Sequence, residues 1–221
     1  GNLEGAIEDW VLGTELKDQD SINLLLKHFK YLSIKYLFKK RILLINDSIT
    51  NEIANQIVAQ ILHLDSQDSN KSIYLFVNSA GGNLYGSLGI CETMKNSTAN
   101  IYSICWGITA GSATLILASG TKGKRSSCRE GKIAFNLPSI PSETPNLKSV
   151  EVEEYSAAQK IISQELREVT NQNIQRIIED AKYWDKNQDN FLTPQEAISY
   201  GIIDNIVDDN FLIKILVNNE K

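Results

Sequence analysis

The stretch Ile73-Tyr74-Leu75-Phe76-Val77-Asn78-Ser79-Ala80-Gly81-Gly82 decides the fold class. Its first five residues form an apolar run typical of a buried strand, and a glycine pair ends the stretch. A helical pattern follows over about residues 85–95. Glycine adopts backbone angles that other residues avoid, so the pair is typical of a tight turn between a strand and a helix.

The same order of strand, glycine turn and helix occurs again downstream. Residues 101–105 form a second apolar run, Trp106-Gly107-Ile108-Thr109-Ala110-Gly111 predicts a tight turn, and residues 112–119 predict a helix. Apolar spacing predicts further strands at 41–45, 124–128 and 132–135, and further helices at 21–39, 53–64, 150–170 and 173–183. This alternation predicts an α/β fold with a parallel sheet covered by helices.

Composition limits the function classes that remain open. The chain has 221 residues, of which 42% are hydrophobic, and this suits a flexible segment at 1–20 followed by a single domain over 21–221. The formal net charge of -5 gives no electrostatic footprint for nucleic acid. No run approaches the roughly 18 apolar residues of a membrane span, so we expect a soluble protein. Cys91, Cys105 and Cys128 lack metal-ligand spacing and predict buried, reduced thiols, and we expect no cofactor.

Two glycine turns after buried strands are typical of sites that stabilise an oxyanion. Backbone N–H groups converge at such a turn, and a strand-to-helix turn can present a nucleophile beside them. The pair Gly81-Gly82 and the turn at Gly111 fit this arrangement. One such turn alone would indicate only a tight connection, but two in succession indicate a site.

From about Arg41 to Val207 the sequence resembles the proteolytic subunit of the caseinolytic (Clp) protease family. The segments that carry the resemblance are 54–60, 73–82, 120–125 and 196–204. Ala80 stands where the family has proline. The resemblance implies the Clp protease or crotonase-like fold, with parallel sheet layers, covering helices and a protruding handle helix in the region of about 140–172.

Two residues of the family's catalytic triad are replaced in this chain. The family carries its serine in a Gly-x-Ala-Ala-Ser-Met-Gly-Ala turn, and counting from Gly107 places Gly111 at the nucleophile. The family's histidine precedes a residue and a proline, and Asn136 takes that place here. Glycine has no side chain to attack with, and asparagine has no proton-accepting nitrogen near neutral pH. The two histidines of the chain, His28 and His63, both precede the site.

The remaining triad position and the oxyanion frame complete the expected site. The family's aspartate precedes a Phe-Leu-Ser-like segment, and anchoring on residues 191–193 gives Asp189. Counting forward from Thr170 gives Trp184 instead, which implies an insertion at 183–188. The resemblance leaves Gly81, Gly82 and the N–H of Ser112 as a vestigial oxyanion frame.

Taken together, these replacements resemble the non-catalytic Clp paralogue of cyanobacteria and plastids. The resemblance implies a structural or regulatory subunit without peptidase activity, in a heptameric ring of one chain or of this chain with a catalytic Clp paralogue. It also implies a Clp ATPase chaperone as partner, with Tyr74 and Phe76 at the docking surface, and a location in the stroma of a chloroplast or apicoplast. Alternatively, Tyr74 and Phe76 are ordinary strand residues.

The substrate strand of the family is also replaced. Where the family has a glycine-rich strand that pairs with substrate, residues 139–145 contain Pro141 and Pro145. Proline removes a ladder donor, so we expect weaker peptide binding. An ordinary polar loop is the alternative.

Two other functions stay open from the residues alone. Ser112 could act as a displaced nucleophile with Lys122, Lys124 or Lys132 as its base, although its hydroxyl is expected to cap the following helix. An enoyl-hydratase-like activity on the same frame would need an acid pair beside Gly81-Gly82, which the sequence does not supply. Residues 185–196 resemble an EF-hand calcium loop, with ligand positions at Asp185, Asn187, Asp189, Thr193 and Glu196, but with Asn190 in place of the turn glycine.

Overall fold

The computed structural model describes residues 34–134, 149–186, 191–208, 210–211 and 214–215. The chain divides into two compact units, Gly1–Lys40 and Arg41–Lys221. Residues 34–39 of the first unit are helical, as expected for the end of the helix at 21–39, whereas the segment 1–20 lies outside the described residues. The sheet and all the helices described below belong to the second unit.

The second unit is built on a parallel sheet, as the sequence predicts. The strand order is β1-β2-β3-β4-β6. The short strand β5 is not part of this order and pairs with β3. Every pair of named strands is parallel. The strands are β1 Ile42–Ile45, β2 Ile73–Ser79, β3 Ile101–Thr109, β4 Arg125–Ser127, β5 Lys132–Ile133 and β6 Asn205–Ile206.

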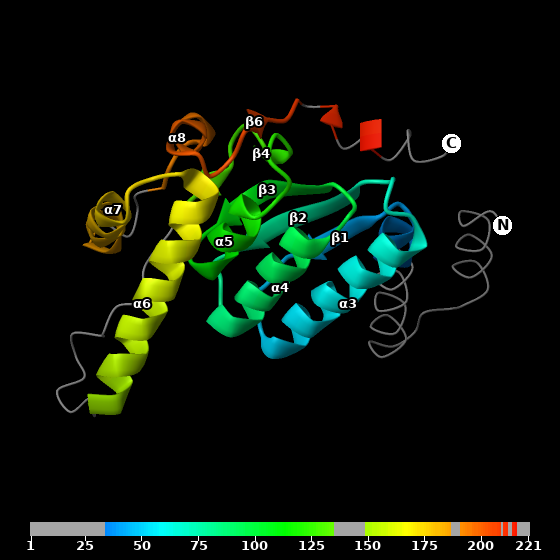
Figure 1. Cartoon of the computed structure of the whole chain (residues 1–221). Helices are drawn as coiled ribbons and strands as arrows, with labels where there is room; N and C mark the ends of the chain where they lie inside the picture. The colour runs from blue at the N-terminus through cyan, green and yellow to red at the C-terminus, as the bar shows by residue number, and fades with distance from the viewer. Residues whose placement is uncertain (1–33, 135–148, 187–190, 209, 212–213, 216–221) are drawn as a thin grey trace, which may run out of the picture. The chain divides into compact units, whose positions relative to one another are not determined.

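Helices α3, α4 and α5 lie along one side of the sheet, and α6 runs away from it (Figure 1). α6 packs against α5 and α7. The helices are α3 Asn51–Gln67, α4 Leu84–Asn96, α5 Ser112–Ala118, α6 Ser149–Thr170, α7 Ile174–Lys186 and α8 Pro194–Tyr200. The fold class expected from the sequence is therefore confirmed.

Burial explains why the apolar patterns form these elements. Ile73, Leu75 and Val77 alternate along β2 and so share one face, and all three are fully buried, as expected for a face that packs into the core. Ile57 and Ile61 point from α3 into the same core at helical spacing. Three thiols are free: Cys91 and Cys105 are buried as expected, and Cys128 is partly exposed. Burial raises the pKa of the Cys91 thiol to about 12.

The turn expected at 106–111 is shorter than the sequence predicts. Strand β3 continues to Thr109, because residues Ile108 and Thr109 pair with β5. Between the pairs Val77–Cys105 and Ser79–Thr109, three residues of β3 face the single residue Asn78. The Asn78 Oδ1 atom fills the gap and accepts a hydrogen bond from the Ile108 N–H at 3.0 Å. The prediction was wrong because a bulge, and not a turn, follows residue 105.

No helix in the described part of the chain combines the length and the apolarity that crossing a membrane requires.

Candidate functional site

Gly111 forms the sharp turn between β3 and α5. Its backbone angles are φ 55° and ψ -131°, and it is the N-cap residue of α5. A strand, a sharp turn and a helix in this order are the arrangement that presents a nucleophile in many hydrolases. The turn is therefore present, but the residue at its apex has no side chain.

Gly81 and Gly82 lie directly against this turn. A Cβ atom on Gly81 would lie 2.9 Å from the Ser112 nitrogen, and one on Gly82 would lie 2.4 Å from the Ile49 oxygen. Both residues have positive φ angles, 101° and 152°. The structure thus brings together the three parts of the expected oxyanion frame, and the close approach of backbone segments explains why both residues are glycine.

The N–H groups of both glycines donate to serine hydroxyls of the same chain. The Gly81 N–H donates to Ser79 Oγ at 3.1 Å, and the Gly82 N–H donates to Ser112 Oγ at 3.1 Å. Ser87 Oγ lies 2.9 Å from Ser112 Oγ in a hydroxyl–hydroxyl hydrogen bond. Within the described residues, the Ser112 hydroxyl bonds the Gly82 N–H and Ser87 Oγ and no backbone N–H of α5, so the expectation of a helix cap was wrong.

Sequence reasoning missed Ser79 and Ser87. Ser79 lies two residues before Gly81, at a spacing typical of a serine that bonds a nearby backbone N–H, so its role had a local signal. Ser87 had none, since it meets Ser112 only through the packing of α4 on α5.

The lysines proposed as bases for Ser112 face other partners. The Lys124 Nζ atom lies 5.0 Å from the centre of the Tyr102 ring, and the Lys132 Nζ atom lies 5.6 Å from that of Phe191. Lys122 lines a different pocket, at the ends of α5 and α6. Within the described ranges, Ser112 has no hydrogen bond to a lysine amine. The geometry therefore gives the Ser112 alternative no support.

Asn136 and Asp189 lie outside the described residues, so their geometry is not part of this site description. The described residues next to both segments are held together. Leu192 N–H donates to the Ile133 oxygen at 2.7 Å, and Ile133 N–H donates to the Leu192 oxygen at 3.2 Å. Thr114 Oγ1 of α5 donates to the Ala134 oxygen at 2.5 Å.

Glu196 forms a capping box at the start of α8. Its Oε2 atom accepts the Thr193 N–H at 2.8 Å and the Thr193 hydroxyl at 2.7 Å. These hydrogen bonds lower the pKa of the Glu196 carboxyl. Asp185 lies within the last turn of α7, and Asn187 lies outside the described residues. Across the described ranges, no group of three or more His, Cys, Asp or Glu side chains is placed to hold a metal ion.

Tyr74 and Phe76 belong to an aromatic band across β2 and β3. The rings of Tyr74 and Tyr102 stack at 4.8 Å, and the ring of Phe76 meets that of Trp106 edge-on at 5.5 Å. Trp106 is 41% exposed, whereas Phe76 is only 4% exposed. Burial raises the pKa of Tyr74. The sequence indicated the β2 residues but not their β3 partners: Tyr102 is the register partner of Tyr74, and Trp106 lies in the bulge of β3.

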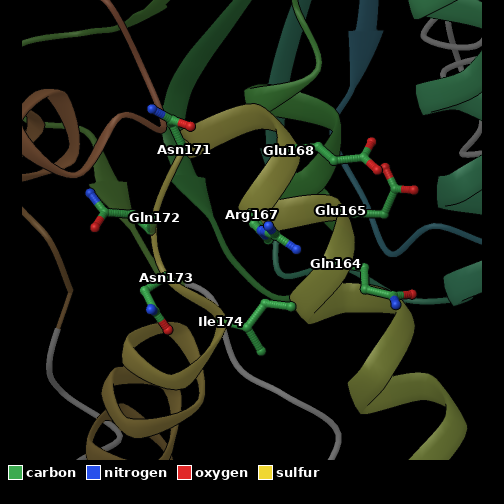
Figure 2. A pocket seen from close by; sticks show the side chains of 8 residues that line it. All are labelled: Gln164, Glu165, Arg167, Glu168, Asn171, Gln172, Asn173 and Ile174. Carbon is green, nitrogen blue, oxygen red and sulfur yellow. The ribbon is translucent and has the colours of Figure 1, made fainter.

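A polar pocket of about 970 Å³ lies at the connection between α6 and α7. Figure 2 shows its lining side chains, and none of them is an expected site residue. Beside it, the Lys95 Nζ atom of α4 bonds Glu165 of α6 at 2.6 Å. The lining residues are Gln164, Glu165, Arg167, Glu168, Asn171, Gln172, Asn173 and Ile174.

Comparisons with known proteins point to one family. Residues 27–210 match the family model described as Clp protease. The ATP-dependent Clp protease proteolytic subunit 2 of Parasynechococcus marenigrum (strain WH8102) is 34% identical over 174 residues, which are 78% of this chain and 85% of that protein. Subunit 1 of Prochlorococcus marinus (strain NATL2A) is 36% identical over 172 residues, 77% of this chain and 85% of that protein.

A relative from another bacterial lineage gives the same result. The ATP-dependent Clp protease proteolytic subunit of Ligilactobacillus salivarius (strain UCC118) is 34% identical over 179 residues, which are 80% of this chain and 88% of that protein. The match of the family model and the coverage of these relatives lead to one conclusion: the chain belongs to the Clp protease family.

Proposed function

We propose that this chain is a non-catalytic subunit of a Clp-type, ATP-dependent protease complex, with a structural or regulatory role. The observation that carries the proposal is Gly111, which stands at the apex of an intact strand–turn–helix where a nucleophile would be presented. Without a hydroxyl or thiol at this point, no covalent acyl intermediate can form there.

The absence of a base supports the same proposal. By the sequence resemblance, Asn136 replaces the histidine, and an amide does not accept a proton near neutral pH. His63 is exposed on α3, and His28 lies outside the described residues. Loss of nucleophile and base together removes the two groups that the triad mechanism requires.

A fluorophosphonate probe tests the non-catalytic assignment. In an active serine peptidase the serine oxygen bonds to phosphorus, fluoride leaves, and the hydroxyl proton goes to the base. We expect no labelling of the native chain by intact-mass spectrometry, with a catalytic Clp relative labelled in parallel as the control. Stoichiometric labelling at Ser112 would overturn the assignment.

We further propose that the chain assembles into a heptameric ring, alone or with a catalytic Clp paralogue. The support is the family membership and α6, which projects from the sheet in the manner expected of a handle helix (Figure 1). Analytical ultracentrifugation across a range of concentrations, with and without a catalytic paralogue, tests this. If the sedimentation coefficient stays at the value expected for the 24.7 kDa monomer in every mixture, ring assembly is contradicted.

A Clp ATPase is the proposed partner, and the aromatic band that contains Tyr74 and Phe76 is the proposed docking surface. Binding of the ATPase should weaken in the variant Tyr74→Ala, and Leu62→Ala on the outside of α3 provides an exposed apolar control. Equal binding by both variants and the parent would place docking elsewhere.

The stroma of a plastid-like organelle, a chloroplast or an apicoplast, is the proposed location. Its support is the cyanobacterial origin of several relatives, together with the resemblance to the plastid paralogue. Imaging of the tagged full-length gene product tests it, and a signal spread through the cytoplasm would contradict it.

A further inference from the structure

In an active peptidase the oxyanion donors must be available to the reacting carbonyl. Their contribution to the rate comes from N–H groups that point at the developing charge and have no competing acceptor in the protein. In this chain the Gly82 N–H already has an acceptor, the Ser112 hydroxyl, at 3.1 Å. The frame is therefore formed but occupied by the chain's own side chain.

We infer that Ser112 closes the oxyanion frame, with Ser87 holding its hydroxyl in place, so that a substrate oxygen cannot reach the Gly82 N–H. The inference rests on the proposed function, because it concerns the same site, and it adds a second block that is independent of the missing nucleophile.

The burial of the Ser112 and Ser87 hydroxyls indicates that the hydrogen bond from the Gly82 N–H to Ser112 is persistent. Ser112 is 8% exposed and Ser87 is 0% exposed, so water competes poorly for their hydrogen bonds. Ser87 Oγ also donates to the Asn83 oxygen at 2.9 Å, which anchors the pair to the start of α4. The contact joins residues 30 positions apart in the chain, so it is not a local turn motif.

The second donor of the glycine pair is closed in the same way. Ser79 Oγ accepts the Gly81 N–H at 3.1 Å and itself donates to the Asp47 oxygen at 2.7 Å. Both N–H groups of the pair thus donate to hydroxyls that a third group holds in position. A carbonyl oxygen entering the frame would have to displace one of these contacts.

Hydrogen exchange at the Gly82 amide in the full chain tests the inference directly. Gly82 is exposed, so its amide should exchange rapidly once its acceptor is gone. In Ser112→Ala we expect exchange to accelerate about tenfold, the effect of losing one hydrogen bond of ordinary strength. Ser87→Ala is the comparison variant, because it leaves the acceptor of the Gly82 N–H in place and removes only the group that positions it, so we expect a smaller acceleration than in Ser112→Ala.

Two outcomes of this measurement would overturn the inference. One is an unchanged exchange rate in Ser112→Ala. The other is an equal acceleration in both variants, which would show general loosening of the α4–α5 packing and no specific closure.

Partial restoration of the site provides the second arm. The variant Gly111→Ser with Asn136→His restores a nucleophile and an imidazole, and the fluorophosphonate probe then measures whether phosphonyl oxygen enters the frame. Adding Ser112→Ala should raise the labelling rate about 100-fold, the usual effect of one oxyanion donor. Equal rates with and without Ser112→Ala would refute the closure, whereas labelling of the unaltered chain would refute the proposed function.

Discussion

The Arg125 guanidinium links four parts of the chain. It donates to both Asp204 oxygens, at 2.9 and 2.6 Å, and to the carbonyl oxygens of Ala118 and Val169 at 3.3 and 3.0 Å. Arg125 is 5% exposed, so these partners must compensate for the water that its buried charge has lost. This one residue thereby ties the ends of α5 and α6 to the strand β4 and the approach to β6.

Asp204→Asn should lower the free energy of unfolding by about 3 kcal/mol, because it leaves a buried guanidinium without its counter-charge. Urea unfolding followed by tryptophan fluorescence measures the change. Asp208→Asn is the control, since the exposed pair of Asp208 and Lys214 should contribute nothing measurable. Equal effects of the two substitutions would contradict the importance of burial.

The same pair predicts a loss of stability in acid. Burial raises the pKa of Asp204, but the hydrogen bonds and charge of Arg125 outweigh it and leave the pKa below its ordinary value. A depressed carboxyl pKa stabilises the fold above the unfolded-state pKa of about 3.9, and this stabilisation is lost as pH falls through the folded-state pKa. Unfolding free energies measured from pH 6 to about pH 2 should therefore fall less steeply in Asp204→Asn than in the parent.

At the scale of single elements, two glycines should respond to alanine in opposite directions. Gly201 ends α8 with φ 92°, and a Cβ atom there would lie 2.8 Å from the Thr170 oxygen, so Gly201→Ala should destabilise the fold by about 2 kcal/mol. Gly89 lies inside α4 with nothing within 4 Å of an added Cβ, so Gly89→Ala should stabilise it by about 0.5–1 kcal/mol. Thermal unfolding of the two variants measures both signs, and a shared sign would contradict the backbone argument.

The capping box of α8 leads to a prediction about calcium. Because Glu196 already uses its Oε2 atom to begin the helix, we expect calorimetry to give a flat calcium titration for both the parent and Asp185→Ala. Thr193→Ala should lower stability by about 1 kcal/mol through loss of the cap. Heat that saturates in the parent and disappears in Asp185→Ala would instead establish a calcium site.

Predictability from the sequence differs between elements for physical reasons. Helix α3 follows from apolar residues at a period of 3.6, and strand β2 follows from a short apolar run, because each element buries a defined set of side chains in the core. The extension of β3 past Cys105 did not follow, because a bulge depends on its partner strands and on Asn78. Strand β6 has two residues, too few for a periodic signal.

The candidate site divides in the same way. The glycines at 81, 82 and 111 were predictable, because positions with positive φ angles and close backbone contacts favour glycine over other residues. The occupation of the Gly82 N–H by Ser112 was not, since it depends on which way a hydroxyl points after α4 has packed on α5.

At the scale of the whole molecule, the described side chains of α6 are buried toward its C-terminal end. Ile162 and Leu166 near its C-terminal end are buried, while residues such as Glu153 and Lys160 are exposed. The ion pair of Lys95 with Glu165 fixes this end to α4. The exposed part of α6 is the surface that the proposed ring assembly would use.

Mixed rings should show how this chain affects proteolysis. If it joins rings with a catalytic Clp paralogue without contributing a site, peptide cleavage per ring should fall in proportion to its share of the subunits. Cleavage of a short fluorogenic peptide by rings of defined composition measures this. The control is a set of rings that contain, in place of this chain, a catalytic paralogue whose own serine is replaced. Cleavage that does not change with ring composition would contradict either the co-assembly or the inactivity of this chain.

The angles of Gly111 also bear on the evolution of the chain. A serine there would have to adopt φ 55° and ψ -131° with its Cβ 3.0 Å from the Ala80 oxygen, a strain of about 1–3 kcal/mol. An enzyme tolerates such strain because activity is gained in exchange, but on the proposed function, in which Asn136 supplies no base, a serine here would bring only the instability. On the proposed function, selection for stability therefore favours the glycine, and a return to activity would need substitutions at both Gly111 and Asn136.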